Sequence, residues 1–193
     1  MTKAEAFAPA KINLTLHVTG QRQDGYHLLD SLVVFADFGD RVMVREADDL
    51  TLQISGPKSA GLTDGEDNLV LRAARLAGVS TACISLDKHL PAAAGIGGGS
   101  ADAAATLRAL SASHGAQIPK QEELLKLGAD VPVCLKSTSL RMSGIGECTD
   151  PVPTVPSLPA ILVNPGLPVH TPDVFRALKS KNGAPMPDIP AFS

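Results

Sequence analysis

The chain has 193 residues, of which 44% are hydrophobic and 3% aromatic, and its formal net charge is −3. This length is typical of one domain, or of one domain and part of a second, and the weak charge without a basic stripe or a long apolar run argues against nucleic-acid binding and a membrane span. The cysteines Cys83, Cys134 and Cys148 are scattered without a CxxC pair, which favours a cytoplasmic protein with reduced thiols over a disulfide framework or a zinc site.

Residues 11–18 alternate between polar and apolar side chains, which predicts a half-buried strand. Lys11 and Asn13 lie on its polar face, whereas Leu14 and Leu16 belong to the face that we expect to be buried. The polar face is either solvated, as is usual for an antiparallel sheet, or lines a site.

A turn signal, Asp24-Gly25, comes directly before Tyr26, the single tyrosine of the chain, and His27. One interpretation is that the tyrosine covers a core edge and that the histidine is a surface residue. The other is an aromatic platform and a hydrogen-bonding imidazole for a planar base.

Further elements follow in order. Residues 32–35 predict a buried strand, and residues 41–45 and 50–54 predict a hairpin through residues 46–49. Asn68 begins a predicted helix that runs to about Leu76.

Four glycines lie within residues 95–99, between a predicted strand at residues 84–87 and an alanine-rich helical run at residues 101–112. Glycine lets the backbone approach a ligand, and a helix start offers free N–H groups, so this context favours a cradle for nucleotide phosphates. No Gly-Lys-Ser/Thr follows, which excludes a Walker A loop, and a flexible linker remains the alternative. We expect Ser100 to cap the helix or to face a metal or phosphate.

Asp130 is a lone carboxylate in an apolar run that follows a predicted helix at residues 119–127. It either caps the next turn or pairs with a cation, for which Lys11 is the candidate, because an unpaired buried carboxylate is costly.

The remaining chain predicts a strand at residues 139–143, a proline-rich connector at residues 151–159 and an apolar strand at residues 160–164. A short helix is expected at residues 171–178, and little order after Lys179.

Segments 8–14, 24–27, 90–105, 127–132, 144–147 and 164–166 resemble the GHMP kinase superfamily, in the order typical of it. The glycine loop alone indicates the superfamily. Together with PAKINL, DGYH and GADVP it is similar to the branch that acts on a cytidyl-methylerythritol substrate.

The resemblance implies ATP-dependent phosphorylation of the 2-hydroxyl of this substrate, in isoprenoid precursor biosynthesis. It implies Lys11 and Asp130 as catalytic residues, Asn13, Tyr26 and His27 as substrate-binding residues, and Mg²⁺ near Ser100. The implied ATP-binding residues are Asn68 and the loop residues Pro91, Ala92, Ala93, Ala94, Gly95, Ile96, Gly97, Gly98, Gly99, Ser100 and Ala101.

The implied fold class is α+β, a two-domain GHMP-kinase-like sandwich with residues 1–150 as the ATP-binding domain. Because the superfamily has a longer second domain, we expect residues 151–193 to be the start of an incomplete one. We expect a monomer or weak homodimer that binds a small cytidyl substrate. The alternatives are another GHMP small-molecule kinase, an inactive nucleotide-binding fragment, or a purely structural α+β domain.

Overall fold

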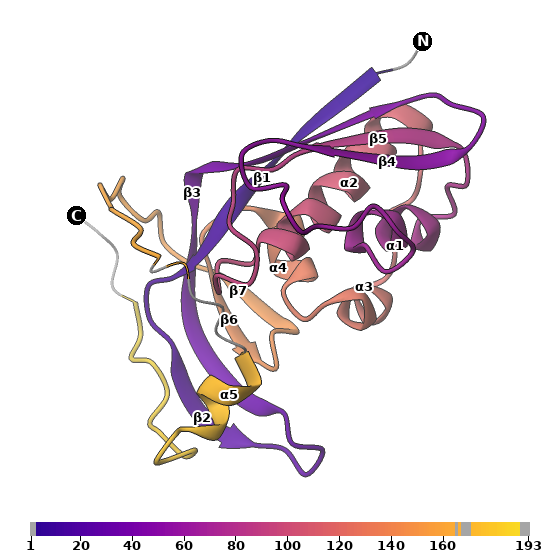
Figure 1. Ribbon diagram of the computed structural model, residues 1–193. Helices are drawn as coiled ribbons and strands as arrows, with labels where there is room; N and C mark the ends of the chain where they lie inside the picture. The colour runs from indigo at the N-terminus through magenta and orange to yellow at the C-terminus, as the bar shows by residue number, and fades with distance from the viewer. Residues whose placement is uncertain (1–2, 165, 167–170, 190–193) are drawn as a thin grey trace.

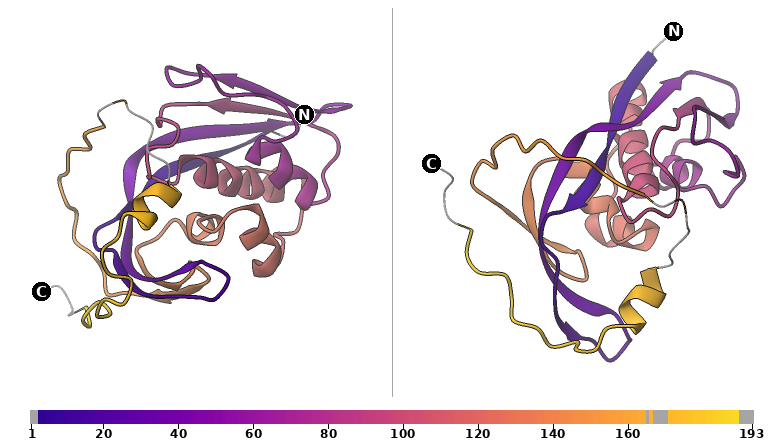
Figure 2. Two further views of the ribbon diagram at one scale, coloured as in Figure 1. Left: turned by 60° about the horizontal axis from the view of Figure 1, so that its bottom comes forward. Right: turned by 60° about the vertical axis from the view of Figure 1, so that its left-hand side comes forward.

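A computed structural model describes residues 3–164, 166 and 171–189 of the chain. One seven-stranded sheet curves around helices α1 to α4, which cover one of its faces (Figures 1 and 2). The elements are β1 (Lys3–Asn13), β2 (His17–Gln21), β3 (His27–Arg45), β4 (Leu50–Ser55), α1 (Leu69–Leu76), β5 (Ala82–Asp87), α2 (Gly98–His114), α3 (Gln121–Leu127), α4 (Val131–Lys136), β6 (Leu140–Gly144), β7 (Cys148–Pro151) and α5 (Thr171–Arg176). No helix in these described ranges is long and apolar enough to cross a membrane.

The sheet is built on β3, a 19-residue strand that pairs with β1, β2, β5 and β6. The predicted hairpin between residues 41–45 and 50–54 is wrong. β5 lies between β3 and β4, pairing antiparallel with the first and parallel with the second. The local turn sequence could not reveal this, because the inserted strand comes about 30 residues later in the chain.

The strand predicted at residues 11–18 is interrupted. β1 ends at Asn13, and β2 begins only at His17. Between them the Thr15 hydroxyl accepts the Leu32 amide at 3.0 Å, so a side chain takes a bond of the sheet ladder. Leu14 and Leu16, which we expected to be buried, are 42% and 49% exposed.

The main core lies between the sheet and α2. Ala101, Ala104 and Ala105 of this helix are buried against β3 and β5 residues such as Val42 and Ile84. Small side chains let the helix and sheet backbones approach closely, as the alanine-rich sequence predicts.

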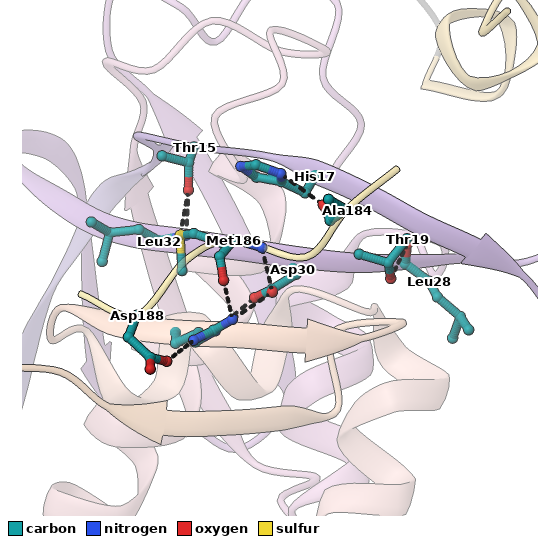
Figure 3. A network of polar contacts seen from close by, with 10 residues as sticks. Thr15, His17, Thr19, Leu28, Asp30, Leu32, Ala184, Met186 and Asp188 are labelled. Carbon is teal, nitrogen blue, oxygen red and sulfur yellow. Dashed lines mark hydrogen bonds and ion pairs between the residues drawn. The ribbon is translucent and has the colours of Figure 1, made fainter. Parts of the chain in front are cut away.

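The chain after β7 differs most from expectation. The strand predicted at residues 160–164 is absent, and Ile161 and Val163 are 89% and 87% exposed. The tail, expected to lack order, lies along β2 and β3 (Figure 3). Gly183 donates its amide to Val18 at 2.7 Å, and Met186, 5% exposed, donates its amide to Asp30 at 2.9 Å.

Candidate active site

The glycine loop connects β5 to α2, as predicted for a strand, loop and helix. Its backbone takes left-handed conformations at Ala93, Gly95 and Gly97, with φ of 52°, 72° and 66°. The Ile96 carbonyl accepts the Lys11 amide at 2.9 Å, so the loop is attached to β1. These contacts are those of an ordered loop and not of a flexible linker.

Ser100 does not cap α2, contrary to our expectation. Gly97 is the N-cap residue, without any side-chain cap, and the helix begins at Gly98. Ser100 is therefore the third helical residue. A Cβ placed on Gly128 would lie 3.4 Å from Ser100 Oγ, so this hydroxyl faces the turn that leads to Asp130.

Lys11 and Asp130 form an ion pair beside the loop. Lys11 Nζ lies 2.9 Å from Asp130 Oδ1, and the two side chains are 5% and 35% exposed. Asp130 occupies the N-cap position of α4 but makes no side-chain cap, so the pairing alternative is correct. A Cβ on Gly97 would lie 3.2 Å from Lys11 Cβ, which shows how closely the loop passes this lysine.

Asn13, two residues after Lys11 on β1, is hydrogen-bonded to the Lys11–Asp130 pair through Lys11. Its Oδ1 accepts from Lys11 Nζ at 3.2 Å, and its Nδ2 donates to Ser31 Oγ at 2.6 Å. Ser31 is fully buried and donates to the Thr15 carbonyl at 2.5 Å. No sequence pattern identified Ser31, because its role depends on its register opposite β1.

His27 is the first residue of β3, and Tyr26 directly precedes it. Tyr26 is 58% exposed, and the His27 ring stacks on Phe175 of α5 with centroids 4.7 Å apart and planes at 16°. His27 Nε2 is buried without a hydrogen-bond partner in the described part of the chain. Phe175 was missed in the sequence, because only the fold brings it to His27.

The two polar groups are separated along one strand. Ser31 comes four residues after His27 on β3, which corresponds to roughly 13 Å along the strand. A molecule that contacted both Asn13 and His27 would therefore be elongated. The structure does not bring Tyr26 and His27 into contact with the Lys11–Asp130 pair.

Asn68 caps α1. Its Oδ1 accepts the Val70 amide at 2.9 Å, and its Nδ2 donates to the Thr63 carbonyl at 2.7 Å. The next residue, Leu69, contacts the loop, since a Cβ on Gly99 would lie 3.4 Å from Leu69 Cδ1. Asn68 is thus the neighbour of a residue that contacts the loop, while its own side chain caps α1.

A buried ionic cluster below the loop was also missed. Lys88 is hydrogen-bonded to Asp40 of β3 and, at 2.7 Å, to Asp102 of α2. All three are at most 3% exposed. Burial, together with the charge of Asp40, raises the pKa of Asp102 to about 7, although Lys88 opposes this shift. In the sequence, Asp102 is simply an aspartate in the helical run and Lys88 a lysine after a strand, and no local pattern connects them.

The arrangement combines an anion cradle, a partly exposed carboxylate and a buried ammonium group. The free N–H groups at the start of α2 favour a bound phosphate, and Lys11 adds a positive charge beside it. Asp130 can accept a proton at the same place. These are the components that phosphoryl transfer requires.

Comparison with known proteins agrees with this geometry. Residues 68–140 match the family model of the GHMP kinases N terminal domain. A 4-diphosphocytidyl-2-C-methyl-D-erythritol kinase of Ruegeria pomeroyi is 61% identical over 190 residues, which cover 97% of this chain and 68% of the relative. One from Dinoroseobacter shibae is 58% identical over 188 residues, covering 97% of this chain and 65% of the relative.

A solved structure has the same fold. The crystal structure of a 4-(cytidine 5'-diphospho)-2C-methyl-D-erythritol kinase aligns with a TM-score of 0.79 and 38% identity, over 95% of this chain and 68% of the other. The chain therefore spans about two thirds of the length of these relatives.

Proposed function

The chain belongs to the family of 4-diphosphocytidyl-2-C-methyl-D-erythritol kinases, within the GHMP kinases. We propose that it transfers the γ-phosphoryl group of ATP to the 2-hydroxyl of 4-diphosphocytidyl-2-C-methyl-D-erythritol. The observation that carries this proposal is the Lys11–Asp130 ion pair of 2.9 Å directly beside the glycine loop. The reaction would provide a precursor for isoprenoid biosynthesis.

Asp130 is placed to interact with the substrate hydroxyl that accepts the phosphoryl group. Its carboxylate is partly exposed and held from one side by Lys11, so it can orient the attacking hydroxyl and accept its proton. Lys11 stabilises negative charge on the oxygens around the transferred group. Asn13, hydrogen-bonded to Lys11 Nζ, is the neighbouring group on the substrate side.

The glycine loop is proposed to hold ATP through residues 91–101, with backbone N–H groups at the start of α2 facing the phosphates. We place Asn68 on the nucleotide side as well, although its side chain caps α1 and is engaged there. The adenine would then lie near the start of α1, where Leu69 contacts the loop.

The residues beside the loop fit a nucleotide-bound Mg²⁺ ion. Within the described ranges, no group of three His, Cys, Asp or Glu side chains could hold a metal by itself. Mg²⁺ bound through phosphate oxygens needs only one or two protein oxygens, which Ser100 Oγ and the Asp130 carboxylate offer. When bound, the ion neutralises charge on the phosphates.

On the substrate side, the exposed Tyr26 ring and His27 are proposed to bind the cytosine base. His27 Nε2 is buried and has no hydrogen-bond partner among the described residues, so a hydrogen bond between this atom and the base requires Phe175, which stacks on the ring, to move. The separation of about 13 Å along β3 suits a ligand whose base and sugar alcohol are joined by a diphosphate. This supports a cytidyl substrate over the smaller substrates of other GHMP kinases.

We further propose that residues 1–150 form the ATP-binding domain and residues 151–193 the beginning of a second domain. The protein is proposed to act in the cytoplasm, as a monomer or weak homodimer, without a nucleic-acid partner.

The proposal is tested by measuring ADP release from Mg-ATP with and without the cytidyl-methylerythritol substrate. We expect release that depends on the substrate and disappears in Asp130→Asn. Release with homoserine or mevalonate instead would indicate another GHMP kinase. Binding of an ATP analogue without any release would contradict the proposed turnover and leave a nucleotide-binding chain.

A further inference from the structure

The buried cluster of Lys88, Asp40 and Asp102 joins three elements around the glycine loop. Lys88 directly follows β5, Asp40 lies on β3, and Asp102 lies near the N-terminal end of α2. Lys88 and Asp102 are each 3% exposed and Asp40 is fully buried. None of the three belongs to the catalytic or substrate groups described above.

Asp40 holds the chain that leads into the loop. One of its oxygens accepts from Lys88 Nζ. The other accepts the backbone amides of His89, at 2.5 Å, and Leu90, at 2.7 Å. Three consecutive residues before Pro91 are therefore attached to a single carboxylate.

Lys88 connects this segment to the helix beyond the loop. Its Nζ donates to Asp102 Oδ2 at 2.7 Å, and a Cβ on Gly98 would lie 3.3 Å from Nζ. The ammonium group thus lies beneath the first residue of α2. Both ends of the loop are held by one side chain.

Stability alone does not account for such a cluster. A buried ion pair is often replaceable by apolar residues without loss of stability, and a positive charge at the positive end of a helix is unfavourable by itself. The cluster holds two backbone amides at one end of the loop and a side chain of α2 at the other, which points to a role in the geometry of the loop.

We propose that Lys88 and Asp40 are positioning residues, which hold the glycine loop in the conformation that binds nucleotide. This inference rests on the proposed function, since it requires that the loop binds ATP. The two residues act on the nucleotide only through the backbone at residues 88–98.

The two carboxylates are not equivalent. Asp40 accepts three hydrogen bonds, whereas Asp102 accepts one from Lys88, and its Oδ1 is buried without a partner in the described part of the chain. In Asp102→Asn the remaining oxygen can still accept from Lys88. In Asp40→Asn the side-chain NH₂ group would face either the ammonium group of Lys88 or the backbone amides of residues 89 and 90. Both are hydrogen-bond donors, so a hydrogen bond would be lost in either orientation.

Asp30 provides a matched control. It is also a buried aspartate of β3, 5% exposed, and it is paired with a cation, Arg141, at 2.6 Å. Its other contacts are to the tail and not to the loop. Asp30→Asn should therefore lower stability without altering nucleotide binding.

The experiment measures the affinity of the full chain for a non-hydrolysable ATP analogue with Mg²⁺ by calorimetry, together with thermal unfolding and amide hydrogen exchange. We expect Lys88→Met and Asp40→Asn to weaken the affinity by about tenfold or more and to speed exchange at His89 and Leu90, because a broken buried pair is costly. Asp102→Asn and Asp30→Asn should stay within about twofold of the wild-type affinity, which is below 0.5 kcal/mol.

If Asp40→Asn does not fold, Lys88→Met decides the test, with exchange at His89 and Leu90 as its structural readout. Unchanged affinity and unchanged exchange in a folded Lys88→Met chain would overturn the positioning role. A loss of affinity in Asp30→Asn equal to that in Lys88→Met would also overturn it, since a general loss of stability would then be the cause. A wild-type chain that binds no nucleotide would contradict the proposed function itself, whereas a failure confined to the variants contradicts only this inference.

Discussion

Lys11 Nζ lies 2.9 Å from Asp130 Oδ1, although the two residues are 119 positions apart in the chain. The contact joins the end of β1 to the start of α4, and the glycine loop passes directly beside it. An ammonium group, a carboxylate and an anion cradle therefore meet at one place.

Asp130→Asn should lower turnover by about 10²–10⁴-fold, because it removes a group that can accept the hydroxyl proton. ATP affinity should change little, since the proposed phosphate contacts are made by the loop. Steady-state ADP release and analogue binding separate the two effects. Near-normal turnover would remove Asp130 from the mechanism.

Tyr26→Ala should weaken binding of the cytidyl substrate by about 1–3 kcal/mol, the range typical of losing one base–aromatic stack. The ring is 58% exposed, so little stability should be lost. Calorimetry with the substrate measures the effect, and affinity for an ATP analogue is the internal control. Equal substrate affinity in the variant and the wild type would reject the stacking role.

Gly97→Ala should cost more stability than Gly95→Ala. Both residues have positive φ, 66° and 72°, and share a backbone penalty of about 1–2 kcal/mol. Only at position 97 would the new Cβ also meet Lys11 Cβ, at 3.2 Å, whereas nothing lies within 4 Å at position 95. Urea unfolding of both variants gives the difference, and equal losses would contradict the close approach of the loop to Lys11.

Ala104→Leu should destabilise the chain by about 1–3 kcal/mol, because the alanine is fully buried between α2 and the sheet. Ala112→Leu is the matched control, since Ala112 lies on the exposed side of the same helix. Chemical unfolding should show almost no loss in the control. A similar loss in both would mean that helix propensity and not packing is responsible.

Acid should weaken the contact between the tail and the sheet. Hydrogen bonds from Arg141 are the largest cause that lowers the pKa of Asp30 below its ordinary value, and the Met186 amide adds to the effect. A carboxyl group whose pKa is lower in the folded state raises the free energy of unfolding. This contribution is present above the unfolded-state pKa of about 3.9 and is lost as the pH falls through the folded-state pKa. The difference in unfolding free energy between wild type and Asp30→Asn should therefore shrink below about pH 4. A difference independent of pH would contradict the ionised pair.

Local sequence was sufficient to predict many elements and most candidate site residues. Glycine spacing and the alanine run predicted the loop and α2, and Asn68 marked the start of α1. The lone carboxylate in an apolar run drew attention to Asp130, and a cation partner was required on energetic grounds. These predictions succeed because backbone preferences, helix capping and the cost of burying charge act within a few residues.

The tertiary structure alone decided the rest. β5 enters the sheet between β3 and β4, Thr15 interrupts the first strand, and the tail binds Asp30, none of which follows from neighbouring residues. The sequence by itself thus determined the glycine loop, the helices α1, α2, α3 and α5, and the need of Asp130 for a cation, with Lys11 as the candidate. Only the folded chain brought Lys88 to Asp40 and Phe175 to His27, because strand order and register are set by contacts between distant segments, which leave no periodic pattern in the sequence.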